Sequence, residues 1–260
     1  MGGGKGLGFQ MRHMANAIQI LTVALLLIGA GQVQAVTSLK IEFGEVGQTR
    51  QIWSDPNLEG TALSGGEWWF VGSRTLSMGG SEEIDVAWDF STNADPFVDG
   101  VFAFTNNTSS TIQLMTTYSV NVVPSLAFAT GGASVIGNLT VDSTGGTLGH
   151  IGASGSTPES MYTTLVDGSA FKTLLDFDSS VSLAFGSGST APASFGLPGL
   201  TTNVPGGVAT SIGSRLAFTL TPGDSASFTS RFEVVPEPTT ALLVATGLVG
   251  LGLSRKRLQR

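Results

Sequence analysis

The feature that most constrains the fold is an alternation of apolar and polar residues that runs through residues 216–234. Apolar side chains occupy alternate positions on both sides of the tripeptide Pro222-Gly223-Asp224: Leu216, Phe218, Leu220, Ala226, Phe228, Phe232 and Val234. A period of two is the pattern of a strand with one buried face. Proline followed by glycine suits the centre of a type II turn. The region therefore predicts a β-hairpin that ends close to Val235.

The same period recurs upstream, in residues 84–90, 111–123 and 133–142. Residues 143–157 and 186–207 are rich in Gly, Ser and Thr and predict long loops. A short helix is predicted from Pro158, with Thr157 as its N-cap, and a second helix over residues 169–175. Many alternating strands with few helices are typical of all-β proteins. We therefore expect one body, residues 36–235, built as an antiparallel β-sandwich or jelly roll.

The N-terminal segment, residues 1–35, has the layout of a secretory signal peptide. Arg12 supplies a positive charge, residues 18–28 form an apolar run, and Val33-Gln34-Ala35 fits a small-x-small cleavage pattern. We expect export through the Sec translocon and cleavage between Ala35 and Val36. Met11 is an alternative start, since a glycine-rich stretch precedes it. The other interpretation is a membrane helix that is retained, although the apolar run is short for a span.

The C-terminal segment, residues 236–260, combines three features in a fixed order. Pro236, Glu237 and Pro238 favour an extended backbone. An apolar run over residues 241–253 comes next, and the cations Arg255, Lys256 and Arg257 follow it. This is a stop-transfer layout that leaves the basic end in the cytoplasm. We expect a helix over residues 241–253 to anchor the chain in the inner membrane, although at about 20 Å it is shorter than the roughly 30 Å hydrocarbon core.

This tail resembles the PEP-CTERM sorting signal of Gram-negative bacteria, and the resemblance is confined to the tail. It implies that an exosortase, a membrane-embedded transpeptidase-like enzyme, recognises Pro236, Glu237 and Pro238 and cleaves nearby. Arg255, Lys256 and Arg257 would retain the chain in the membrane until then. The resemblance also implies a destination at the cell surface or in the extracellular matrix, with a link to exopolysaccharide or biofilm. The alternative is an ordinary membrane anchor that is never processed.

Composition excludes several kinds of chemistry in the body. The sequence has no cysteine, which rules out disulfides, thiolate metal sites and a cysteine nucleophile. His150 lies in a predicted loop with no Gly-x-Ser-x-Gly elbow, so we expect it to be exposed and inert. We therefore predict no catalytic residues and no enzyme. The net charge is −7 although half of the 12 basic residues lie near the chain ends. The body between them is strongly acidic and is not expected to bind nucleic acid.

Oxygen-bearing side chains at every second position provide a candidate metal site. Asp89, Ser91, Asn93 and Asp95 have the spacing of ligands in a calcium loop, and Asp99 could add an oxygen. The segment lacks the glycine and the final glutamate of an EF-hand loop. The alternative is a solvated turn between two strands, because Asn and Asp are common turn residues. Calcium here is the one cofactor that the sequence suggests.

Tryptophans suggest a second kind of ligand. Trp53, Trp68 and Trp69 could offer an aromatic platform to a sugar, although Trp68 and Trp69 are adjacent and would point to opposite faces of a strand. Trp88 is expected in the core. The sequence thus leaves two functions open. The chain is an exported structural or interaction protein of the surface or matrix, or its body is a carbohydrate- or calcium-binding module.

Overall fold

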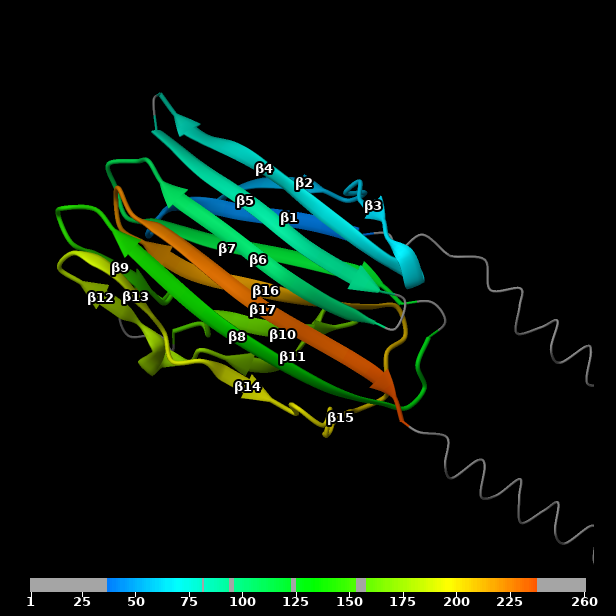
Figure 1. Cartoon of the computed structure of the whole chain (residues 1–260). Helices are drawn as coiled ribbons and strands as arrows, with labels where there is room; N and C mark the ends of the chain where they lie inside the picture. Colours follow the sequence, from blue (N-terminus) through cyan, green and yellow to red (C-terminus); the bar gives the residue numbers. More distant parts are fainter. Residues whose placement is uncertain (1–36, 81, 94–95, 123–124, 153–157, 238–260) are drawn as a thin grey trace, which may run out of the picture. The chain divides into compact units, whose positions relative to one another are not determined.

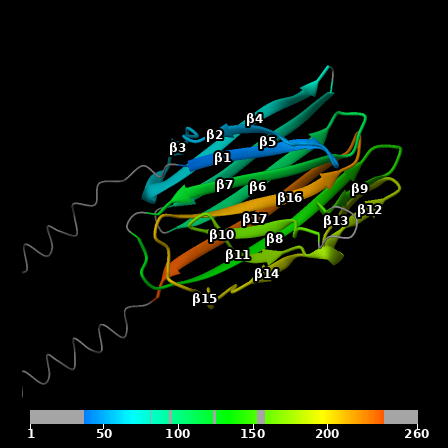
Figure 2. The ribbon, with the colours of Figure 1, turned by 180° about the vertical axis from the view of Figure 1, so that it is seen from behind.

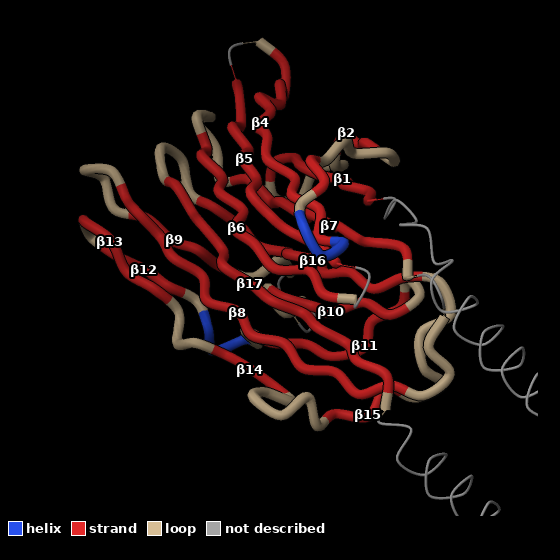
Figure 3. Tube along the Cα trace, turned by 45° about the vertical axis from the view of Figure 1, so that its right-hand side comes forward, coloured by secondary structure: helices blue, strands red, loops and turns tan. Residues whose placement is uncertain are grey.

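The computed structural model describes residues 37–80, 82–93, 96–122, 125–152 and 158–237. They belong to the second of two compact units of the chain, Ala35–Arg260. These residues form two antiparallel sheets (Figure 1). Within the described ranges, two short 3₁₀ turns, η1 (Ser64–Gly66) and η2 (Phe177–Ser179), are the helical elements (Figure 3). The prediction of an all-β body with antiparallel strands is therefore confirmed.

One sheet, called here the β7 sheet, has eight strands in the order β11-β10-β16-β7-β1-β2, with β9 beside β16 and β12 beside β9 (Figure 2). Its strands are β1 (Thr37–Glu45), β2 (Gln51–Asp55), β7 (Ile112–Asn121), β9 (Gly146–Gly149), β10 (Tyr162–Val166), β11 (Ser169–Leu174), β12 (Val181–Leu183) and β16 (Ser211–Leu220).

The other sheet, called the β17 sheet, has nine strands in the order β13-β8-β17-β6-β5-β4-β3, with β14 and β15 also beside β8. Its strands are β3 (Thr61–Ala62), β4 (Glu67–Gly79), β5 (Glu82–Asn93), β6 (Phe97–Asn106), β8 (Ala129–Val141), β13 (Gly186–Ser189), β14 (Ala193–Phe195), β15 (Thr202–Val204) and β17 (Ser225–Pro236).

The two sheets face each other across one apolar core. Ring centroids of Phe104 in β6 and Phe218 in β16 lie 4.9 Å apart, and those of Phe102 in β6 and Tyr118 in β7 lie 4.6 Å apart. Each contact joins one sheet to the other. The apolar faces predicted for residues 84–90, 111–123 and 133–142 are buried in β5, β7 and β8. Alternation therefore identified the inward face of the long strands correctly.

The predicted hairpin at residues 216–234 is wrong in one respect. Both strands exist and Gly223 has a φ of 76°, but β16 belongs to the β7 sheet and β17 to the β17 sheet. Phe218 and Phe228 therefore meet across the core, with ring centroids 4.9 Å apart. The turn crosses between the layers because both strands bury the same apolar face. Alternation fixes that face but does not say which strand pairs with which.

The helix predicted over residues 169–175 is also wrong, since Ser169–Leu174 forms strand β11. Asp167 and Gly168 both have positive φ, 50° and 74°, as a type I′ hairpin turn requires. Val166 of β10 then pairs with Ser169 of β11. The Asp-Gly dipeptide between two strands was the sequence signal for this hairpin. No helix begins at Pro158 either, and Thr157 lies outside the described residues.

The two glycine-rich regions predicted to be loops contain short strands. Residues 143–157 include β9, and residues 186–207 include β13, β14 and β15. The last three pair one after another with β8, along most of its length. Their backbones are ordered by pairing with β8, a non-local partner that composition does not reveal.

The pairing leaves two contrasting sides. The protected side consists of β11, β13, β14 and β15, where Phe171 of β11 packs edge-on against Phe195 of β14 with centroids 5.8 Å apart. The open side consists of β2, β3 and β4, where the Arg74 guanidinium of β4 lies 5.8 Å from the Trp53 ring of β2. In Figure 1, β4 runs along the upper edge and β14 and β15 along the lower one.

Candidate functional site

Strand β17 connects the core of the body to the predicted sorting motif. It lies between β6 and β8, pairing Ser225–Glu233 with β6 and Ser225–Pro236 with β8. Phe228, Phe232 and Val234 are fully buried along it. Thr229 and Arg231 face solvent, as the alternation predicts, whereas Ser230 is buried on the inward face and hydrogen-bonded to the Tyr118 hydroxyl. A strand bonded on both sides is among the most firmly held parts of a sheet, so the motif begins at a rigid element.

The first two residues of the motif are themselves part of the folded body. Pro236 is the last residue of β17 and stands opposite Ala129 of β8. The Glu237 backbone N–H donates to the Phe128 carbonyl oxygen at 3.1 Å. Proline has no N–H to donate, and a strand end is where this loss is tolerated. Both Pro236 and Glu237 side chains are exposed. The body thus presents an extended, exposed Pro-Glu segment with no spacer before it.

A group of charges lies on the outer face of β17 just before the motif. The Arg231 side chain donates to the Glu233 carboxylate, and its Nη1 lies 3.6 Å from Asp99 Oδ2 of β6. Burial raises the pKa of Asp99; Arg231 opposes the rise, while Glu67 and Glu233 add to it. The hydrogen bond from Arg231 to Glu233 raises the pKa of Arg231 above its usual value. Arg231 thus partly neutralises the acidic groups beside it, and Glu237 lies beyond this group.

Most of the other predicted sorting residues fall outside the described part of the chain. These are Ala35 and Val36 at the signal cleavage point, Pro238, the apolar run 241–253, and Arg255, Lys256 and Arg257. Within the described residues, no helix is long and apolar enough to cross a membrane. The signal peptide, the anchor helix and the basic cluster therefore stay predictions.

The calcium loop predicted at Asp89, Ser91, Asn93 and Asp95 needs correction. Asp89, Ser91 and Asn93 belong to strand β5, and Asp95 lies outside the described residues. In a strand, the Cα atoms of Asp89 and Asn93 are separated by about 13 Å. Two oxygen atoms that bind one calcium ion can be at most about 5 Å apart, because each lies about 2.4 Å from the ion. The short Asp and Asn side chains cannot close the difference. A period of two is shared by calcium loops and strands, which explains the error.

The tryptophans separate as their positions on the strands require. Trp88 is buried at 7% exposure, and Trp53 stacks on it with ring centroids 6.0 Å apart. Trp68 packs against the core, whereas Trp69 lies on the outer face of β4 and is 38% exposed. Trp69 Nε1–H donates to Asp89 Oδ1 at 2.6 Å. The predicted core position of Trp88 is confirmed. The three other tryptophans do not share one face and form no common platform.

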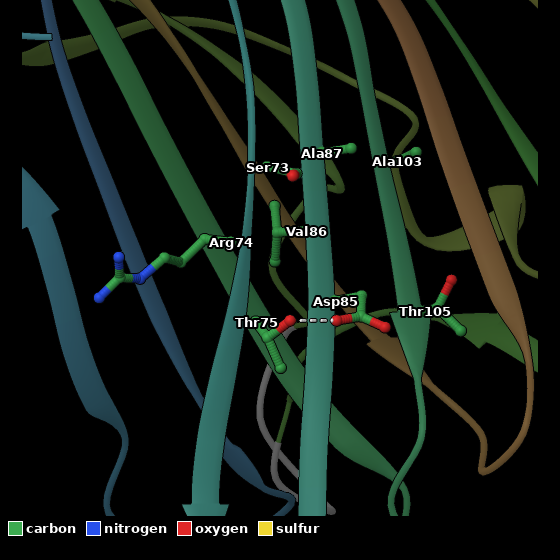
Figure 4. A pocket seen from close by; sticks show the side chains of 8 residues that line it. All are labelled: Ser73, Arg74, Thr75, Asp85, Val86, Ala87, Ala103 and Thr105. Atoms are coloured by element: carbon green, nitrogen blue, oxygen red, sulfur yellow. Dashed lines mark hydrogen bonds between the residues drawn. The ribbon is translucent and has the colours of Figure 1, made fainter.

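A shallow pocket of about 190 Å³ lies on the outer face of the β17 sheet (Figure 4). Small side chains on neighbouring strands form its floor, among them Ser73, Ala87 and Ala103. Its carboxylate, Asp85, already accepts hydrogen bonds from Thr75 Oγ1 at 2.7 Å and from Asn107 Nδ2 at 2.8 Å. Since its oxygens are engaged within the protein, the pocket gives no specific support to a ligand site. Carbohydrate binding stays a prediction.

His150 follows β9 and differs from the expectation that it would be exposed. It is partly buried, and its Nδ1 lies 2.9 Å from the Glu159 carbonyl oxygen. Across the described residues, no group of three or more His, Cys, Asp or Glu side chains could hold a metal ion. Sequence reasoning also missed the segment Phe128–Thr130, which holds the motif. No local signal could have revealed it, because the pairing joins residues more than a hundred positions apart.

The fold places the central strand β17 directly before an exposed Pro-Glu segment, at the position where the sequence predicts a C-terminal sorting motif. The comparison with known families agrees. The model of the PEP-CTERM protein-sorting motif matches residues 234–257. The tail of this chain therefore carries a PEP-CTERM motif, which implies export, a membrane-anchored sorting signal and processing by an exosortase. No curated protein and no solved structure matches the chain.

Proposed function

We propose that this chain is an exported β-sandwich protein that an exosortase releases from its membrane tail, and that the body then acts as a structural or interaction protein of the cell surface or extracellular matrix. The Sec translocon exports it, and the helix over residues 241–253 holds it at the inner membrane before processing. The link to exopolysaccharide or biofilm is supported by the resemblance of the tail alone. We propose no enzymatic step and no cofactor.

The observation that carries this proposal is the continuity of β17 with the motif. Pro236 is still paired with Ala129, and the Glu237 N–H is still bonded to Phe128. Cleavage beyond Glu237 would therefore leave the whole body intact, with its last strand bonded on both sides. Before cleavage, the exposed Glu237 side chain would be presented by a rigid element close to the membrane. An enzyme that reads the motif gains from this pre-organisation, because little ordering remains to be done on binding.

Two alanine substitutions on the same strand test whether the motif is read. Glu237→Ala removes an exposed carboxylate from the motif but keeps the backbone N–H that bonds to Phe128. Glu233→Ala is the matched control, since it removes a carboxylate four residues earlier, within the Arg231 group. We expect Glu237→Ala to be exported and inserted but to lose most of its processing, so that the full-length form accumulates in the membrane fraction. Glu233→Ala should be processed like the unaltered protein.

The readout is the size of the protein in membrane and extracellular fractions, followed by immunoblot in a host that makes the exosortase. Normal processing of Glu237→Ala would contradict the proposal, because the apolar run would then act as a plain anchor. Equal loss of processing in both variants would also contradict it. That outcome would make the body's charge, rather than the motif, the determinant of processing.

A further inference from the structure

The outer edge of β4 lacks a strand partner over most of its length within the described residues. Strand β3 covers only two residues of β4, Trp68 and Trp69. From Phe70 to Gly79, β4 pairs with β5 on one side alone. Figure 3 shows β4 at the margin of its sheet, next to β5. An unpaired edge exposes backbone donors and acceptors that can bind another strand.

The backbone groups that face this open edge can be assigned from the β3 turn. The Leu63 N–H donates to the Glu67 carbonyl oxygen at 2.8 Å, so Glu67 directs its backbone groups toward β3. Along an antiparallel strand these groups alternate between the two neighbours. Val71, Ser73 and Thr75 therefore direct their N–H and C=O groups away from β5, toward solvent. All three side chains are exposed on the outer face of the sheet.

This edge has few of the devices that natural sheets use against edge pairing, namely short strands, charges, bulges and proline. Between Phe70 and Gly79 the one charged residue is Arg74. The register to β5 is regular from Glu67 to Ser77, and the bulge comes only between Ser77 and Gly79. Exposed apolar side chains gather on the open side of the body. Four of the eight large ones in the described residues lie there: Ile52, Leu63, Trp69 and Val71.

We propose that β4 pairs edge to edge with β4 of a second copy of this chain, antiparallel, about a two-fold axis at Ser73. In this register Val71 of each copy stands opposite Thr75 of the other, and the two Ser73 residues face each other. Three pairs of residues then exchange backbone hydrogen bonds, and the two β17 sheets become one continuous sheet. A symmetric dimer needs a self-complementary surface, which one strand edge supplies to both copies.

The charge on the edge selects this register. A two-fold axis at Arg74 would set two guanidinium groups directly opposite each other, which is destabilising. With the axis at Ser73, Arg74 of one copy instead stands opposite Gly72 of the other. Gly72 has no side chain, and a Cβ there would lie 2.7 Å from the Trp88 ring. The Trp88 ring fills the space beside the glycine, and Arg74 meets no opposing charge in this register.

The two ends of the unpaired part of β4 also fit a two-fold axis at Ser73. Pairing about Ser73 brings Ser77 of one copy toward Trp69 of the other, where β3 already occupies the edge. The bulge between Ser77 and Gly79 lies at this point. Bulges bend a strand and end its regular pairing. An axis at Val71 would instead drive Thr75 of one copy into β3 of the other. The regular part of the edge therefore fits an axis at Ser73 better than one at Val71.

This inference deepens the proposed function, because it names a second copy as one partner of the body. The two can fail separately. Edge pairing is measured by cross-linking, whereas the sorting proposal is measured by removal of the tail.

Cysteine cross-linking of the full-length protein in the envelope fraction tests the register, since the natural chain has no cysteine. In a hydrogen-bonded pair the Cα atoms lie about 5.5 Å apart, within the range for a disulfide. Ser73→Cys should therefore give a disulfide-linked dimer as the main species on mild oxidation, seen on a non-reducing gel. Ala87→Cys is the matched control. It is exposed on the same face, opposite Ser73 on β5, and should stay monomeric.

A second pair of variants keeps the test specific. Val71→Cys and Thr75→Cys should each dimerise poorly alone and cross-link well when the two proteins are co-expressed. The proposal is overturned if Ser73→Cys stays monomeric, or if it cross-links no better than Ala87→Cys. It is also overturned if Val71→Cys alone dimerises as well as Ser73→Cys, because the contact would then have no defined register.

Discussion

The protected and open sides of the body solve the problem of an unpaired strand edge in different ways. On the protected side, β8 is covered by β13, β14 and β15, of three or four residues each. The neighbouring edge strand β11 is also short, carries Lys172, and contains a bulge at Phe171, where its register with β10 shifts. On the open side, β4 has thirteen residues and a bare edge beyond Trp69.

The same chain thus protects one edge of its sheets and leaves the other available for pairing. Short, irregular and charged strands discourage pairing with another chain, whereas a long regular edge invites it. The side-chain contacts that join the two sheets also differ between the protected and the open side. Phe171 against Phe195 is an apolar closure of the protected side, and Arg74 over Trp53 keeps a charge at the open side. The open side is therefore the part of the body best suited to binding a partner.

The largest expected effect comes from breaking the cover of the protected side. Gly196 follows β14 with a φ of 66°, and a Cβ there would lie 2.3 Å from the Gly131 carbonyl oxygen of β8. Gly196→Ala should lower the free energy of unfolding by about 3 kcal/mol or more, because backbone strain and a clash with backbone act together. Urea unfolding of the exported protein, followed by tryptophan fluorescence, measures the loss.

Gly65 is the matched control on the open side. Its φ is 81°, but no atom lies within 4 Å of the position that a Cβ would take. Gly65→Ala should cost about 1 kcal/mol from backbone strain alone. Equal losses for the two variants would show that the contact of Gly196 with β8 contributes nothing, and would weaken the distinction between the two sides.

A smaller, pH-dependent effect is expected at the turn between β10 and β11. The Asp167 carboxylate accepts backbone hydrogen bonds from Ala209, Thr210 and Ser211, the shortest being 2.7 Å from the Thr210 nitrogen. Burial alone would raise the pKa of Asp167, but these hydrogen bonds outweigh it and hold the pKa below its usual value. The ionised form is thus favoured by folding.

Asp167→Asn should preserve the turn, since Asn-Gly also suits type I′ geometry, and remove the charge. We expect a loss of about 1 kcal/mol near neutral pH, modest because the carboxylate is exposed. A lowered folded-state pKa gives stability above the unfolded value of about 3.9, and that stability is lost as the pH falls through the folded value. The difference between the two proteins should therefore shrink in acid. A difference that does not change with pH would contradict this account of Asp167.

The long strands could be predicted from the sequence because their local pattern and their burial agree. Ile84, Val86 and Phe90 alternate with exposed residues in β5, and the structure buries all three. Pairing was less predictable. The turn at Pro222-Gly223 links two sheets rather than one hairpin, since an inward face is compatible with either arrangement. The Asp167-Gly168 dipeptide, in contrast, is a local signal typical of a hairpin, and the predicted helix over residues 169–175 overlooked it.

The short strands and the surroundings of the motif could not be predicted. The backbones of β13, β14 and β15 are ordered by pairing with β8, and strands of three or four residues are too short to show a clear alternation. The motif itself was visible as Pro236, Glu237 and Pro238, because its composition is local. Its attachment to Phe128 and Ala129 depends on the register of β8 with β17. The same limit applies to the bond from Trp69 to Asp89, which requires the β4–β5 register.

The most direct test of the central claim is the intact mass of the protein recovered from the cell surface or the medium. Cells that make the exosortase should be compared with cells that lack it. With the enzyme, we expect a chain that begins at Val36 and ends shortly after Glu237, without the apolar run 241–253 and the basic residues Arg255, Lys256 and Arg257. Without the enzyme, the chain should keep this tail and stay with the membrane. A surface protein that retains the whole tail, or that begins at Met1 or Met11, would contradict the account.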